Sequence, residues 1–105
     1  MLTDEIIEKI KNSLIKDPRF SDLDFSNLSL SIPRNKDHGD FSTNFAMISS
    51  GSLKSKPIDL AEEMLVLLKQ SQDSFFHDIT VEKPGFINFV ISKEIYQNYL
   101  ADVLL

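Results

Sequence analysis

Residues 78–91, DITVEKPGFINFVI, predict a β-hairpin and with it the class of the fold. Two stretches of alternating apolar residues flank a turn signal made of proline and glycine. A two-residue loop would place the apolar residues of the two strands on opposite faces. A three-residue loop, from Lys83 to Gly85, pairs Val81 with Ile87 and buries one continuous face. We therefore expect the longer loop, with Gly85 supplying a left-handed backbone conformation.

The same register leaves Phe86 and Asn88 side by side and exposed, on the face of the hairpin that points away from the core. An aromatic ring is a stacking surface for an unpaired base, and a carboxamide both donates to and accepts from a base edge. Because side chains two apart on a strand point the same way, both can address one nucleotide. The alternative is that another element covers this face and that Phe86 belongs to the core.

The rest of the chain predicts one more strand and four helices. Leu28, Leu30 and Ile32 alternate with serines, which is typical of a half-buried strand. Apolar residues recur at helical spacing in four segments, whose expected starts are Thr3, Asp40 or Ser42, Pro57 and Ser92. This order predicts a small two-layer α+β domain, with helices packed on a mostly antiparallel sheet and a C-terminal hairpin followed by a helix.

Length and composition predict one globular domain over residues 1–105, at 12.0 kDa and 42% apolar residues. The chain has no cysteine, which excludes disulfides, thiolate zinc sites and cysteine nucleophiles. The longest apolar run, Met64 to Leu68, is far too short to span a membrane. The first residues are acidic rather than basic and apolar, so we expect no signal peptide and a cytoplasmic protein.

The net charge of −5 argues against a protein whose whole surface binds nucleic acid. Basic residues are nevertheless concentrated between Pro33 and Pro57, where a local basic edge is expected. Together with the lysine of the hairpin loop, they are the candidate phosphate contacts: Arg34, Lys36, Lys54, Lys56 and Lys83.

The segment from Asp37 to Asp40 could bind a metal or serve as acid and base, because two carboxylates and the His38 imidazole lie within four residues. Such a set suits a small metal-dependent hydrolase. We favour the structural interpretation, in which Gly39 forms a tight turn and Asp40 caps the following helix. The sequence therefore assigns no catalytic residue and no metal ligand.

Three segments carry a family resemblance: residues 37–44 (DHGDFSTN), 57–68 (PIDLAEEMLVLL) and 81–89 (VEKPGFINF). Their order and spacing resemble those of the N-terminal additional domain of arginyl-tRNA synthetases, over essentially the whole chain. The resemblance implies a module that contacts the D-loop at the outer corner of tRNA. Phe86 and Asn88 match the positions that contact a D-loop base in some relatives, with Phe86 replacing a tyrosine. Structural roles are implied for the matching residues Gly39, Asp40, Asn44 and Gly85.

The same resemblance implies a larger class I enzyme, which joins arginine to its tRNA with ATP and Mg²⁺. The ATP-binding motifs of that class are absent here, so we expect the catalytic and anticodon-binding domains to lie outside this chain. An apolar helical stripe that continues to Leu105 also indicates a fragment of a longer protein. The expected partners are tRNA and the catalytic domain, and the chain by itself is expected to be inactive, without a cofactor. The alternative is a protein-interaction module whose exposed face carries Phe86 and Val90.

Overall fold

Strand β3 (Phe86–Ile91) lies at the centre of a three-stranded antiparallel sheet, between β1 (Phe41–Thr43) and β2 (Phe76–Glu82). This computed structural model describes residues 2–71 and 74–104, the last three by their backbone. Helices pack on the sheet, and the β2–β3 hairpin is followed by a helix, so the predicted α+β class is confirmed.

The hairpin has the predicted three-residue loop, in which the peptide bond before Pro84 is cis. Val81 pairs with Ile87, and this register holds from Asp78 to Glu82, with a shift between Phe76 and Asp78. The core face of β3 carries side chains that are at most 4% exposed, those of Ile87, Phe89 and Ile91. Their burial stabilises the fold by roughly 1.5–3 kcal/mol for each side chain.

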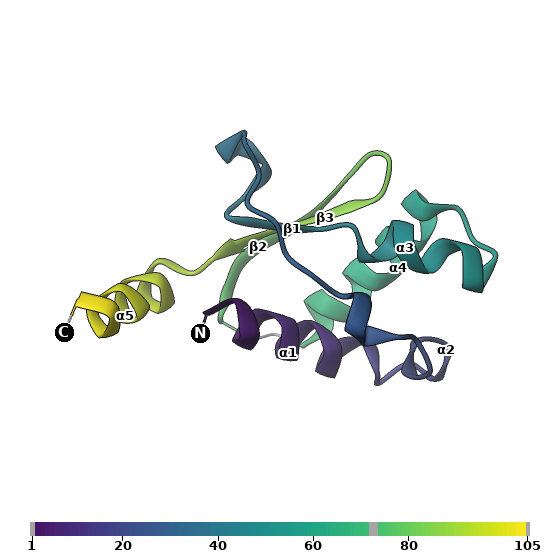
Figure 1. Ribbon diagram of the computed structural model, residues 1–105, viewed down its shortest axis with the longest axis horizontal. Helices are drawn as coiled ribbons and strands as arrows, with labels where there is room; N and C mark the ends of the chain where they lie inside the picture. Colours follow the sequence, from purple (N-terminus) through teal and green to yellow (C-terminus); the bar gives the residue numbers. More distant parts are fainter. Residues whose placement is uncertain (1, 72–73, 105) are drawn as a thin grey trace.

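Two amphipathic helices, α1 (Leu2–Leu14) and α4 (Pro57–Gln70), lie along one side of the sheet, as Figure 1 shows. Helix α4 begins at Pro57 as predicted, with the proline in the first turn. Helix α1 begins at Leu2, so the prediction that Thr3 caps it is wrong. The buried faces of the two helices are Leu2, Ile6, Ile10 and Leu14 in α1, and Leu60, Ala61, Met64 and Leu68 in α4.

The remaining helices are α2 (Pro18–Ser21), α3 (Phe45–Leu53) and α5 (Lys93–Leu104), with short 3-10 turns at η1 (Phe25–Asn27) and η2 (Lys36–His38). The Ser92 hydroxyl accepts a hydrogen bond from the Ile95 N–H, which confirms the predicted cap of α5. Helix α5 extends away from the sheet (Figure 1). The side chains expected at its C-terminal end, Val103 and Leu104, lie outside those described. No helix among residues 2–71 and 74–104 has the length and apolar character needed to cross a membrane.

The third strand is not the one that the sequence predicted. Residues 28–32 contribute a single bridge, between Ser31 and Ser42, and Ile32 is 79% exposed. The strand is instead β1, which falls where the start of a helix was expected. Strand β1 has only three residues and is held by β3, from far along the chain, so local periodicity could not reveal it.

Candidate nucleic-acid interface

Phe86 and Asn88 lie on the same face of β3, opposite the core face, as the register requires. Phe86, the first residue of the strand, is half-buried, whereas Asn88 is only 5% exposed. Asn88 pairs with Ser42 of β1 on one side and with Thr80 of β2 on the other. The expectation of two exposed side chains is therefore wrong for Asn88, whose face of the sheet is also crossed by the side chains of His38 and Glu82.

The loop that precedes β1 packs directly against β3. Gly39 has a φ of +92°, and a Cβ atom there would lie 2.7 Å from the carbonyl oxygen of Phe89. The Asp40 N–H donates to that same oxygen at 2.8 Å, and the Asp40 carboxylate accepts the Ile91 N–H at 2.9 Å. The loop is thus attached to β3 at Phe89 and at Ile91. The first contact requires a glycine at position 39, and the second requires a hydrogen-bond acceptor in the side chain of residue 40.

Asp40 therefore does not cap a helix, contrary to expectation. Helix α3 starts at Phe45, whose N–H is bound at 3.2 Å by the hydroxyl of Thr43. Asn44 occupies the N-cap position but makes no capping hydrogen bond with its exposed side chain. Asp40 binds β3 instead, because the β1 strand intervenes between it and the helix.

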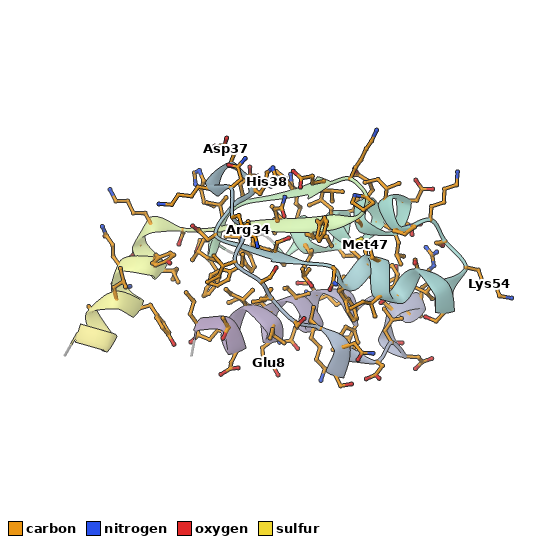
Figure 2. The ribbon with its side chains drawn as sticks, turned by 45° about the horizontal axis from the view of Figure 1, so that its top comes forward. Glu8, Arg34, Asp37, His38, Met47 and Lys54 are labelled. Atoms are coloured by element: carbon orange, nitrogen blue, oxygen red, sulfur yellow. The ribbon has the colours of Figure 1, made fainter. Side chains whose placement is uncertain are left out.

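His38 reaches across the sheet to the far end of β2. Its Nε2 atom lies 2.7 Å from Oε2 of Glu82, and the two side chains are 41% and 39% exposed. Figure 2 shows the loop with Asp37 and His38 on one side of the sheet, opposite Glu8 of α1. Sequence reasoning missed this contact, since nothing in the local spacing connects His38 with the hairpin.

Gly85 has a different role from the one expected, since its backbone is not left-handed. The residue is buried, and a Cβ atom there would lie 3.0 Å from backbone and side-chain atoms of Pro57. The hairpin loop therefore packs tightly against the first turn of α4, where a side chain larger than that of glycine would press against Pro57.

The candidate phosphate contacts are all exposed, and they belong to two parts of the surface. Arg34 and Lys36 lie in the segment before β1, whereas Lys54 and Lys56 connect α3 to α4. Arg34 and Lys54 are well separated in Figure 2. Lys83 joins the second group, because the hairpin loop contacts Pro57 through Gly85. The aromatic ring next to this loop, Phe86, therefore lies on the side of the second basic group.

The metal-site alternative finds no support in the geometry of Asp37, His38 and Asp40. His38 binds Glu82, and the Asp40 carboxylate binds a backbone N–H of β3. Among the residues that the structure describes, no three histidine or acidic side chains come close enough to share a metal ion.

One carboxyl group with a shifted pKa lies at η1. The hydroxyl of Ser26, and then its backbone N–H, lower the pKa of Asp24 below the ordinary value. These are the hydrogen bonds of a helix cap, because Asp24 is the N-cap residue of η1.

A comparison with protein families matches residues 2–91 to the arginyl-tRNA synthetase N-terminal domain. The chain belongs to this family. The match includes the loop before β1, α4 and the hairpin, so the resemblance drawn from their motifs is confirmed.

Relatives of this arginyl-tRNA synthetase domain are found in several bacteria. The arginine–tRNA ligase of Bartonella henselae is 39% identical over 101 residues, which cover 92% of this chain and 17% of the ligase. That of Magnetococcus marinus is 32% identical over 102 residues, covering 96% of this chain and 18% of the ligase. The chain thus spans about a sixth of the length of these relatives.

The fold also matches a solved structure, that of the arginyl-tRNA synthetase from Plasmodium falciparum. The TM-score is 0.74 at 19% identity, over 94% of this chain and 17% of the other. At this identity the likeness concerns the fold alone.

Proposed function

We propose that this chain is the N-terminal tRNA-recognition domain of an arginine–tRNA ligase and that it contacts the D-loop corner of the tRNA. The observation that carries the proposal is the family match over residues 2–91, supported by relatives that are named arginine–tRNA ligases. The domain holds the tRNA corner so that the acceptor end reaches a distant active site, which uses binding energy for orientation.

Phe86 is the central residue of the proposed contact. Its half-buried ring is anchored by the sheet, and its remaining surface is available for a D-loop base. Stacking of a base on an aromatic ring contributes about 1–3 kcal/mol. Asn88 contributes through the small part of its amide that reaches the surface, and so acts mainly at the edge of the base.

The two groups of exposed basic residues are proposed to bind the tRNA backbone. Phosphate contacts set the position of a nucleic acid on a protein without reading its sequence. In this arrangement Arg34 and Lys36 contact one side of the bound loop, and Lys54, Lys56 and Lys83 contact the other.

Chemistry is assigned to the rest of the ligase. We propose that the ligase has catalytic and anticodon-binding domains outside residues 1–105, and that the catalytic domain binds arginine, ATP and Mg²⁺ and is a partner of this one. The proposed ligase acts in the cytoplasm.

The test is a chimeric ligase in which this chain replaces the matching segment of the Bartonella henselae enzyme. Phe86→Ala should lower kcat/KM for arginine tRNA roughly tenfold, because a stacking contact is lost. The KM values for arginine and ATP should stay unchanged. Phe86→Tyr is the matched control, since it keeps an aromatic ring and should retain most of the activity.

Chemical probing of the tRNA locates the contact. The chimera should protect bases of the D-loop, and Phe86→Ala should remove that protection. If Phe86→Ala leaves both kcat/KM and the D-loop protection as they were, the proposal is wrong. That result would favour the alternative in which the face of Phe86 and Val90 docks a protein.

A further inference from the structure

The hydrogen bond between His38 and Glu82 crosses the central strand. His38 precedes β1 and Glu82 ends β2, while the order of strands in the sheet is β1-β3-β2. A carboxylate oxygen 2.7 Å from Nε2 requires an N–H donor, so the imidazole donates to Glu82. The two side chains therefore span β3 on the face that carries Phe86 and Asn88.

The position of the imidazole is set by the backbone on which it stands. Directly after it, Gly39 packs against the Phe89 carbonyl, and Asp40 binds β3 at two points. Directly before it, the N–H of Asp37 is held at 3.0 Å by the side chain of Asn35. His38 thus lies in a short turn that is attached to β3 on its C-terminal side and closed by a hydrogen bond within the loop on its N-terminal side.

Glu82 is the acidic residue nearest to the proposed base contact along the hairpin. It is the cross-strand partner of Phe86, so their side chains lie next to each other on the same face. A carboxylate that is free to move beside this ring would approach the phosphates of a stacked nucleotide. Like charges placed together at an interface oppose binding and are screened by salt.

We propose that His38 is a positioning residue for RNA binding: it holds the Glu82 carboxylate across β3 and thereby keeps it from the phosphates of a nucleotide at Phe86. This inference rests on the proposed function of the domain. His38 needs no contact with the RNA for this role.

A double-mutant cycle tests the role, with the Kd of the whole chain for an arginine tRNA transcript as the measured quantity. His38→Ala should raise this Kd roughly threefold to tenfold at low salt, because Glu82 is released beside the phosphates. Glu82→Gln should leave the Kd unchanged or lower it slightly. The double variant should bind as Glu82→Gln does, since no charge remains to be held.

Salt dependence separates this electrostatic role from a structural one. The difference between His38→Ala and the wild type should shrink as KCl is raised from about 50 mM to about 300 mM, because the repulsion is screened. A second variant, His38→Gln, keeps an N–H donor and should retain most of the affinity. Thermal unfolding of each variant checks that the fold is intact.

Two results would overturn the inference. One is a double variant that binds as weakly as His38→Ala, which would mean that His38 contacts the RNA or supports the fold. The other is a His38→Ala variant with wild-type affinity. Phe86→Ala is measured in parallel: if it weakens binding while His38→Ala does not, only the role of His38 is refuted. If Phe86→Ala in the chimeric ligase changes neither kcat/KM nor the D-loop protection, the proposed function and this inference are refuted together.

Discussion

At the scale of the residue, Gly39 and Gly51 show why the same amino acid has different importance in one chain. Gly39 combines a φ of +92° with a contact that leaves no room for a Cβ atom against the Phe89 carbonyl. Gly51 lies in α3, and a Cβ atom there would meet nothing within 4 Å. Only the first glycine is required by the backbone around it.

Substituting each glycine with alanine should therefore have opposite effects. Gly39→Ala should lower the free energy of unfolding by about 2 kcal/mol or more, through backbone strain and displacement of the loop from β3. Gly51→Ala should raise it by about 0.4–1 kcal/mol, because alanine restricts the unfolded chain and favours the helix. Urea unfolding of the two variants measures both values. Equal destabilisation would contradict this account of the loop.

At the scale of the element, α4 connects the layers of the fold. It packs on the sheet and on α1, and its first turn supports the hairpin loop at Gly85. The ion pair between Arg19 and Glu63 attaches α2 to its exposed side. The inner face is apolar, so α4 positions the hairpin mainly through burial.

Two residues of α4 give a matched test of that burial. Met64 is fully buried, whereas Val66 is 55% exposed two positions further along the same helix. Met64→Ala should lower the free energy of unfolding by about 2–5 kcal/mol, because it leaves a cavity in the core. Val66→Ala should change it by no more than about 0.5 kcal/mol. Similar losses in both variants would show that the inner face of α4 has been assigned wrongly.

At the scale of the whole molecule, a negatively charged domain is proposed to bind a polyanion. The chain carries 16 acidic and 11 basic residues, and the proposed phosphate contacts are five exposed basic residues in two groups. Binding through so few positive charges should be weak and should depend only moderately on salt. Stacking at Phe86 then has to supply much of the remaining affinity.

The salt dependence of tRNA binding by the isolated chain measures this balance. A plot of log K against log[KCl] should have a slope no steeper than about −4.5, as expected when at most five phosphates are contacted. Lys83→Ala should make the slope shallower by about 0.9, since one contact is lost. Lys16→Ala, just after α1 on the helical side, should leave it unchanged. Phe86→Ala should lower the affinity without changing the slope, and a changed slope would contradict a stacking role.

Much of the fold could be predicted because its signals are local. The hairpin register follows from which residues alternate and from the length of the loop between them. The start of α4 at Pro57 and the cap of α5 by Ser92 likewise depend on only a few adjacent residues. Strand β1 was missed because three residues are too few to show an alternation of apolar and polar side chains, and because their partners lie far along the chain in β3.

The candidate site divides in the same way. That Phe86 and Asn88 share a face is a property of the strand alone, and the sequence by itself determined it. That Asn88 is nearly buried, that Asp40 binds Ile91 and that His38 binds Glu82 was decided only by the tertiary structure. Each of these depends on segments far apart in the chain, which meet because β3 lies between β1 and β2. Alternation along a strand sets where a side chain points, but the neighbouring strands and loops decide what it meets there.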